Sequence, residues 1–146
     1  MSTVAKLLNT ISQPVWHIHP EETVFQALAL MDEKGIGALP VMYGGQLVGI
    51  VSERDYARKV ILKGRSSRDT PIKEIMTRQV LYVTPEQSMD DCMVIMTSKH
   101  IRHLPVIDNK KMIGLISMGD VVKQIINEQQ DRIKELENYI SWEENY

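Results

Sequence analysis

Two stretches of the sequence, GIVSERD at residues 49–55 and GLISMGD at residues 114–120, share one pattern: Gly, two aliphatic residues, Ser, two variable residues and Asp. A Ser followed three residues later by an acid is close to a capping box, in which both side chains satisfy free backbone N–H groups of a helix's first turn. The same groups can also hold a ligand at a helix N-terminus. The surrounding sequence has to decide between capping and ligand binding.

The two stretches belong to a longer internal repeat. A shift of 65 residues places residues 15–60 on residues 80–125 without a gap, and twelve of the 46 aligned positions are identical. The identical pairs are Val15/Val80, Pro20/Pro85, Glu21/Glu86, Met31/Met96, Lys34/Lys99, Ile36/Ile101, Leu39/Leu104, Pro40/Pro105, Val41/Val106, Gly49/Gly114, Ser52/Ser117 and Asp55/Asp120. Self-similarity of this kind predicts two copies of one structural unit.

Each copy has the pattern of a β-α-β-β-α unit. An extended piece comes first, then a helix with capping-box spacing, then two strands joined by a tight turn, and a second helix after the Ser of the shared motif. The expected strands are residues 15–18, 39–42 and 46–51 in the first copy and residues 80–83, 103–107 and 111–116 in the second. Half the chain is too small to bury both faces of its sheet. We therefore expect an α/β (α+β) fold of two units packed with pseudo-two-fold symmetry.

The predicted organisation along the chain has four parts. Residues 1–64 form the first repeat with an N-terminal segment, residues 65–71 a polar linker, residues 72–127 the second repeat and residues 128–146 a C-terminal helical extension. In that last helix Ile126, Gln129, Ile133, Leu136 and Ile140 step by three and four residues, which is a short heptad-like seam. It is expected to pack on a partner subunit or back on its own domain, with Trp142 and Tyr146 as candidate anchors.

Composition excludes several classes of protein. A net charge of −2 argues against a general nucleic-acid binder, which normally has a basic excess. No 18-residue apolar run is present, so no membrane span is expected. Cys92 is the single cysteine, which excludes an internal disulfide and fits a reducing compartment, so the cytoplasm is the expected location.

The two repeats differ just before their shared Leu-Pro-Val. The first has Gly37 and Ala38, and the second has Arg102 and His103. Small residues let a ligand approach closely, whereas Arg and His offer positive charge and donors suited to phosphate. A surface Arg and a satisfied His are the alternative. Because the Ser and Asp motif is duplicated after an apolar strand and is accompanied by this basic pair, the pattern favours a ribonucleotide site.

At these residues the chain resembles a tandem pair of CBS (cystathionine β-synthase) domains, also called a Bateman module. The resemblance covers about residues 3–127 and rests on GIVSERD, GLISMGD, IGALPV, IRHLPVID and the IMT of residues 75–77. It extends to stand-alone CBS-pair proteins with SERDYARK and a C-terminal helix like LENYI. It implies two clefts between the halves, each formed by the motif of one half and the Leu-Pro-Val region of the other.

The resemblance assigns residues to both clefts. In the first, Asp55 is expected to hold the ribose hydroxyls, Val80 and Pro105 to flank the adenine, and Arg54, Arg102 and His103 to meet a phosphate. The remaining members of this cleft are Ile50, Ser52 and Thr77. The second cleft is expected to consist of Leu115, Ser117, Asp120, Val15, Gly37, Ala38 and Pro40. It lacks the basic pair, and Gly119 stands where the first has Arg54, so weaker phosphate binding is expected there.

The expected function is regulatory rather than catalytic. The chain has no phosphate loop of the type G-x-x-x-x-G-K-[ST], no G-x-G-x-x-G and no G-x-S-x-G. His17 and His19 share one face of a strand, but no metal site is expected from two histidines alone. The resemblance implies AMP, ADP or ATP as ligand, with NAD or S-adenosylmethionine as possibilities, no required cofactor, a homodimer and an unidentified protein partner. A constitutive interaction module with empty clefts is the alternative.

Overall fold

The computed structural model describes residues 2–144. Its helices and strands are α1 (Val4–Thr10), α2 (Val24–Lys34), β1 (Ala38–Tyr43), β2 (Gln46–Ser52), α3 (Glu53–Lys59), the 3-10 turns η1 (Ile61–Lys63) and η2 (Ile72–Glu74), α4 (Met89–Lys99), β3 (His103–Asp108), β4 (Lys111–Ser117) and α5 (Met118–Glu144). This is an α+β fold in which α2-β1-β2-α3 recurs as α4-β3-β4-α5, as the repeat predicts. Tyr146, the proposed anchor, lies outside the described residues.

The two hairpins have the same register. β1 pairs antiparallel with β2, with Ala38 opposite Ser52, and β3 pairs with β4, with His103 opposite Ser117. Each ladder contains one irregularity at the equivalent place, after Val41 and after Val106. The four predicted hairpin strands are confirmed to within one residue at their ends, because short apolar runs bounded by turn residues specify them locally.

The hairpin turns differ in chemistry but share one backbone conformation. In the first repeat Gly44 and Gly45 have φ of 56° and 77°, and in the second Asn109 and Lys110 have φ of 50° and 66°. Positive φ at both central residues matches the right-handed twist of the strands that the turn joins. Glycine adopts this conformation without strain, whereas a lysine does so at a cost.

The expected first strand of each repeat is reduced to one bridging residue. Ile18 pairs in parallel with Val41, and Val83 pairs in parallel with Val106. The Ile18 N–H donates to the Pro40 carbonyl at 3.1 Å, and the Val83 N–H donates to the Pro105 carbonyl at 3.0 Å. Each half is therefore a two-stranded sheet with a short third segment at its edge.

Capping boxes begin the helices where the sequence predicts them. Thr23 caps α2 with Gln26, and Ser88 caps α4 with Asp91. In each box the first residue's side chain accepts the backbone N–H of the third helical residue, whose own side chain accepts the N–H of the cap. The helix starts are therefore determined by interactions over three residues.

The hydrophobic core has two parts, and each is completed by a segment from elsewhere in the chain. Ile72 and Ile75, which follow the first repeat, are buried among the side chains of α2, β1 and β2. Val4 and Leu7 of α1 are buried among the side chains of α4, β3 and β4. The Val4 N–H donates to the Gln87 carbonyl, just as the Ile72 N–H donates to that of Glu22. The N-terminal segment therefore packs on the second repeat. The division of the sequence into repeats that end at residue 64 and begin at residue 72 stays a prediction.

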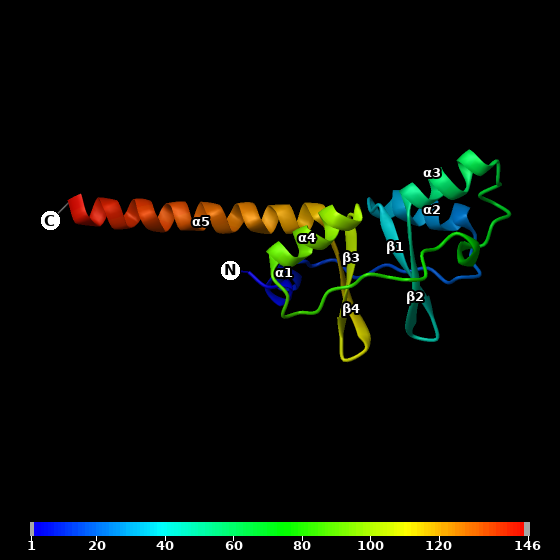
Figure 1. Cartoon of the computed structure of the whole chain (residues 1–146), viewed down its shortest axis with the longest axis horizontal. Coiled ribbons are helices and arrows are strands. Elements are labelled where there is room, and N and C mark those ends of the chain that lie inside the picture. Colours follow the sequence, from blue (N-terminus) through cyan, green and yellow to red (C-terminus); the bar gives the residue numbers. More distant parts are fainter. Residues whose placement is uncertain (1, 145–146) are drawn as a thin grey trace.

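The halves meet along their second strands, where β2 contacts β4. Figure 1 shows the two hairpins side by side, with α5 extending away from them so that the C-terminal end lies far from the body. Within residues 2–144, no helix combines the length and apolar character needed to cross a membrane.

Candidate ligand-binding clefts

Two clefts lie between the repeats, and each takes residues from both. The first has a volume of about 630 Å³ and the second about 490 Å³. Eight of the nine residues expected in the first cleft line it, namely Ile50, Ser52, Arg54, Asp55, Thr77, Val80, Arg102 and His103. Six of the seven expected in the second line that cleft, namely Val15, Gly37, Ala38, Leu115, Ser117 and Asp120.

The two prolines of Leu-Pro-Val are not among the lining residues. Pro40 and Pro105 are buried in β1 and β3, where their carbonyls accept the N–H groups of Ile18 and Val83. That Pro105 flanks a base in the first cleft, and that Pro40 belongs to the second, therefore stays a prediction, which the cavity linings do not support directly. In both strands all three residues of the motif are buried, so the motif fills the core.

The clefts share part of their walls. Gly37, Ala38 and His103 line both of them. A Cβ atom on Gly37 would lie 3.5 Å from His103 Cε1, which is ordinary van der Waals contact. The imidazole of one repeat therefore lies against the glycine of the other, where the sequence predicts only that each belongs to a different cleft.

The acid of each repeated motif is held at the start of its helix. Asp55 Oδ2 accepts the Ser52 backbone N–H at 2.9 Å and the Ser52 hydroxyl at 3.1 Å. Asp120 Oδ2 accepts the Ser117 N–H at 2.8 Å, and the Ser117 hydroxyl accepts the Asp120 N–H at 3.1 Å. The capping interpretation is thus confirmed for both motifs. Because both carboxylates also line clefts, capping and ligand binding are compatible roles of the same side chains.

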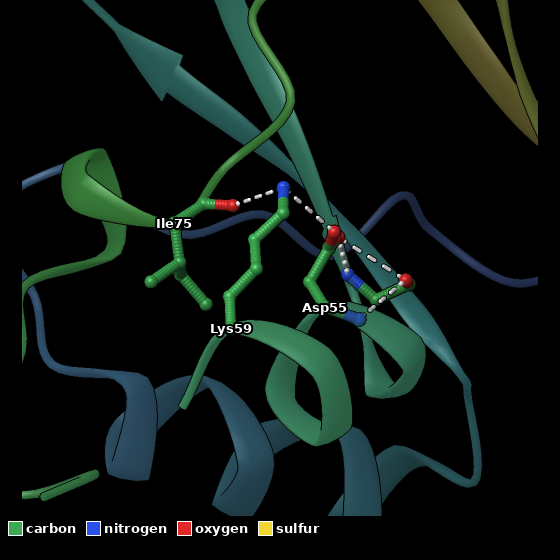
Figure 2. Close-up of polar contacts among 4 residues, drawn as sticks. Asp55, Lys59 and Ile75 are labelled. Atoms are coloured by element: carbon green, nitrogen blue, oxygen red, sulfur yellow. Dashed lines mark hydrogen bonds and ion pairs between the residues drawn. The ribbon is translucent and has the colours of Figure 1, made fainter. Parts of the chain in front are cut away.

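Lys59 forms an ion pair with the second carboxylate oxygen of Asp55. Its ammonium lies 3.0 Å from Asp55 Oδ1 and donates to the Ile75 carbonyl at 2.8 Å, as Figure 2 shows. Sequence reasoning missed this residue, although its position four residues after Asp55 on one helix is the spacing at which an acid and a lysine interact. Lys59 therefore joins the N-terminal turn of α3 to the segment that leads into Thr77.

The clefts differ strongly in charge. The first is lined by Arg54, Arg58, Lys99 and Arg102, together with the carboxylates of Glu53 and Asp55. None of the arginines or lysines in the described chain lines the second cleft, whose one carboxylate is Asp120. The second cleft is instead apolar along Leu8, Ile11, Trp16, Ile36 and Ile113, which the sequence prediction did not include. Leu8 and Ile11 come from the N-terminal segment that packs on the second repeat.

Two of the basic residues already have defined environments. Arg54 Nη1 donates to the His100 carbonyl at 2.7 Å, at the C-terminal end of α4, so this side chain spans the first cleft. Burial lowers the pKa of His103, Arg102 lowers it further, and the carboxylates of Asp120 and Glu53 act in the opposite direction. His103 is therefore mainly a neutral hydrogen-bonding group at pH 7, where its imidazole can donate from one nitrogen and accept at the other.

No group of three or more His, Cys, Asp or Glu side chains suited to a metal ion occurs among residues 2–144. His19 Nδ1 accepts the Glu21 backbone N–H at 3.0 Å, so one nitrogen of this imidazole serves the local turn.

The comparison with protein families matches the CBS domain twice, at residues 4–62 and 72–127. The chain belongs to the CBS-domain family. CBS domain-containing protein CBSX3, mitochondrial, of Arabidopsis thaliana is 42% identical over 125 residues, which is 82% of this chain and 61% of that protein. The chain therefore spans about three fifths of that CBS relative's length.

Solved CBS structures share the fold. A CBS-domain protein from Burkholderia ambifaria MC40-6 is 50% identical, with a TM-score of 0.85 over 88% of this chain and 96% of that one. The CBS domain pair of protein MJ0100, solved in complex with 5'-methylthioadenosine and S-adenosyl-L-methionine, is 24% identical, with a TM-score of 0.75 over 88% of this chain and 98% of that one. The arrangement of two packed repeats is thus the one seen in CBS pairs.

Proposed function

We propose that this CBS pair is a regulatory module that binds adenosine-containing ligands in its two clefts and passes the bound state to a protein partner. AMP, ADP and ATP are the ligands that suit it best, with NAD or S-adenosylmethionine as alternatives. The observation that carries the proposal is that Asp55 and Asp120 each stand at a helix start and line a cleft between the repeats. A carboxylate held in this way can accept both hydroxyls of a ribose.

The charge of the lining residues suggests that the clefts prefer different ligands. The first cleft, with Arg54, Arg58, Lys99 and Arg102, suits the phosphates of AMP, ADP or ATP. The second cleft, with Asp120 and an apolar wall, suits an adenosine whose 5' substituent carries no net negative charge. The complex of the MJ0100 pair with 5'-methylthioadenosine and S-adenosyl-L-methionine supports adenosine compounds of this kind as candidates.

Signalling requires that the ligand distinguish two states of the protein. A ligand shifts a conformational equilibrium only by its difference in affinity for the two states. Arg54 and Lys59 both reach across to segments outside their own helix, at His100 and Ile75. A ligand that engages Arg54 competes with its contact to His100, so binding is coupled to the position of the second repeat. We further propose that the protein is a homodimer and that it acts in the cytoplasm. A reducing compartment suits the single, buried thiol of Cys92.

Isothermal titration of nucleotide-free protein with AMP, ATP, NAD, S-adenosylmethionine and adenosine tests the proposal. Asp55→Asn is expected to weaken AMP binding at the first cleft by about 1.5–3 kcal/mol, the range for hydrogen bonds to a charged group. Arg102→Ala is expected to weaken AMP more than adenosine, because the guanidinium is assigned to the phosphate. Equal losses for both ligands would remove Arg102 from that role.

Asp91→Asn is the matched control. Asp91 occupies the same capping-box position in α4 as Asp55 does in α3, but it lines neither cleft. Its replacement is expected to lower the thermal stability without changing affinity. If Asp55→Asn behaves in the same way, the motif is a helix cap alone. Absence of binding for all five ligands would favour the alternative, a constitutive interaction module.

A further inference from the structure

The last helix has a long part that extends beyond the body of the molecule. Val121 and Gln124 near its start are buried, but every residue from Gln129 to Glu143 is exposed. Figure 1 shows this part of α5 extending away from both hairpins. An isolated helix of this length is marginal in water, because most helical stability in proteins comes from packing of an apolar face. The extension therefore needs a surface to cover it.

The exposed aliphatic side chains of α5 form a single seam that begins on the body and runs along the extension. They are Val122, Ile126, Ile133, Leu136 and Ile140, with exposed fractions of 38%, 49%, 52%, 62% and 54%. Gln129 fills the place between Ile126 and Ile133, so the six seam residues step by four, three, four, three and four. Steps that alternate between four and three residues form the heptad pattern of a coiled coil, in which helices supercoil around each other and their side chains interdigitate.

We propose that the seam of α5 pairs in parallel with the seam of a second copy of this chain, as a two-stranded coiled coil. This specifies the homodimer proposed above and does not depend on ligand binding. In heptad terms Ile126, Ile133 and Ile140 occupy a positions, and Val122, Gln129 and Leu136 occupy d positions. Isoleucine at a with leucine at d favours two parallel strands over three or four.

The polar residues beside the seam support the same arrangement. Arg132 is at a g position and Glu137 at the following e position, so Arg132 of each copy faces Glu137 of the other in a parallel pair. Gln129 then faces Gln129 of the second copy, and the two amides can hydrogen-bond to each other. In an antiparallel pair that keeps all six layers, Gln129 faces Ile133 and its amide loses that partner, which is costly in a buried position.

Cysteine crosslinking of the full chain distinguishes these arrangements. Leu136→Cys places two thiols opposite each other in the parallel pair, whereas Asn138→Cys, on the outer face of the same helix, is the control. The native Cys92 does not interfere, because it is buried and its thiol pKa is raised to about 11. Mild oxidation is expected to give mainly disulfide-linked dimer for Leu136→Cys and little for Asn138→Cys. Equal crosslinking of the two variants would overturn the proposal. A double variant, Leu136→Cys with Ile126→Cys, tests the orientation. Crosslinks formed only between positions 136 and 126 would show an antiparallel pair and would also overturn the proposal.

Sedimentation equilibrium tests the contribution of the seam to assembly. Ile133→Asp is expected to raise the dimer dissociation constant by at least about tenfold, since it places two carboxylates in a buried layer. Lys134→Asp introduces the same side chain on the outer face and is expected to leave the constant unchanged. A dimer unaffected by Ile133→Asp would form through other faces, which overturns the coiled coil and leaves the homodimer standing. A monomeric wild-type chain would overturn both, and neither result bears on ligand affinity.

Discussion

Lys59 forms an ion pair with Asp55 in the first repeat, and the residue 65 positions later, Gln124, forms none with Asp120. Gln124 is buried and its amide donates to the Ser2 hydroxyl at 2.9 Å. Asp55 therefore accepts hydrogen bonds from Ser52 and from Lys59, whereas no ion pair reaches Asp120 within residues 2–144. A carboxylate offers about four acceptor positions, so Asp120 retains more of its capacity for a ribose than Asp55 does.

The first prediction follows from this difference. In an Asp120→Asn background, which isolates the first cleft, Lys59→Gln is expected to tighten adenosine binding by about tenfold, close to the value of one hydrogen bond to a charged group. The reason is that Asp55 Oδ1 becomes available to a ribose hydroxyl. Titration calorimetry with adenosine measures the change. Lys63→Gln, which removes the same charge from an exposed residue outside both clefts, should change nothing. Weaker adenosine binding in Lys59→Gln would show that the lysine holds Asp55 in its binding position.

The second prediction concerns the equivalent glycines of β2 and β4. A Cβ atom on Gly49 would lie 2.6 Å from Met76 Sδ and 3.0 Å from the Thr77 backbone oxygen, whereas on Gly114 it would lie 2.6 Å from Leu8 Cδ2. The end of a leucine side chain can move, but the Thr77 carbonyl accepts the Ile50 N–H at 3.0 Å and cannot move without breaking that bond.

Gly49→Ala is therefore expected to lower the free energy of unfolding by about 2–3 kcal/mol, and Gly114→Ala by about 1 kcal/mol or less, in the range measured for overpacked sites. Urea denaturation of the two variants measures both values. Equal losses would mean that the Thr77 segment yields as easily as Leu8. Since Leu8 lines the second cleft, Gly114→Ala is also expected to change affinity there while leaving the first cleft unaffected.

The third prediction uses the lowered pKa of His103. Because burial lowers this pKa below the ordinary value of 6.5, the unfolded chain binds a proton at a higher pH than the folded one. The contribution of neutral His103 to the free energy of unfolding is fully present above pH 6.5. It decreases as the pH falls from 6.5 to the lower pKa of the folded state. Between pH 7.5 and pH 5.5, a range around the ordinary histidine pKa, the melting temperature of the wild type is expected to fall. The melting temperature of His103→Gln is expected to fall less over the same range. Replacement of the exposed His17 by glutamine serves as the control, and equal slopes for wild type and His103→Gln would contradict the prediction.

The fourth prediction concerns the single thiol. Burial, with a smaller effect of the Asp91 carboxylate, raises the pKa of Cys92 from 9.0 to about 11. A shift of this size lowers the reactive thiolate fraction about a hundredfold at pH 8. A thiol reagent is expected to label the native chain at the rate of unfolding, and to label Asn138→Cys at once. Rapid labelling of native wild type would show that the α4 core opens without global unfolding.

Local chemistry explains why much of the fold could be predicted. The capping boxes of Thr23 and Ser88 depend on residues three positions apart, and the turn at Gly44 depends on two neighbours, so each is visible in the sequence. The two motif acids were assigned to clefts by the resemblance to CBS pairs, and the repeat gives both of them the same position in their units. Their shared use as helix caps was also visible from the spacing.

Contacts between distant segments explain what was missed. Val4 and Ile72 occupy equivalent places in the two cores, but Ile72 follows the repeat that it completes, whereas Val4 lies far before its own. The 65-residue shift therefore does not align them. The burial of Pro40 and Pro105 could not be predicted, because a motif with three apolar residues does not reveal which of them faces a cleft. The role of Lys59 depends on the Ile75 carbonyl, which only the folded chain brings within reach.

The position of the N-terminal segment has a consequence for folding. Residues 2–8 complete the second core, whereas the first core lies within one continuous stretch, residues 16–76. The second repeat therefore depends on a segment that is joined to the first, which couples their denaturation. The molecule is expected to melt in one cooperative calorimetric transition, and severing the chain between the repeats would leave two fragments that associate to regain their structure.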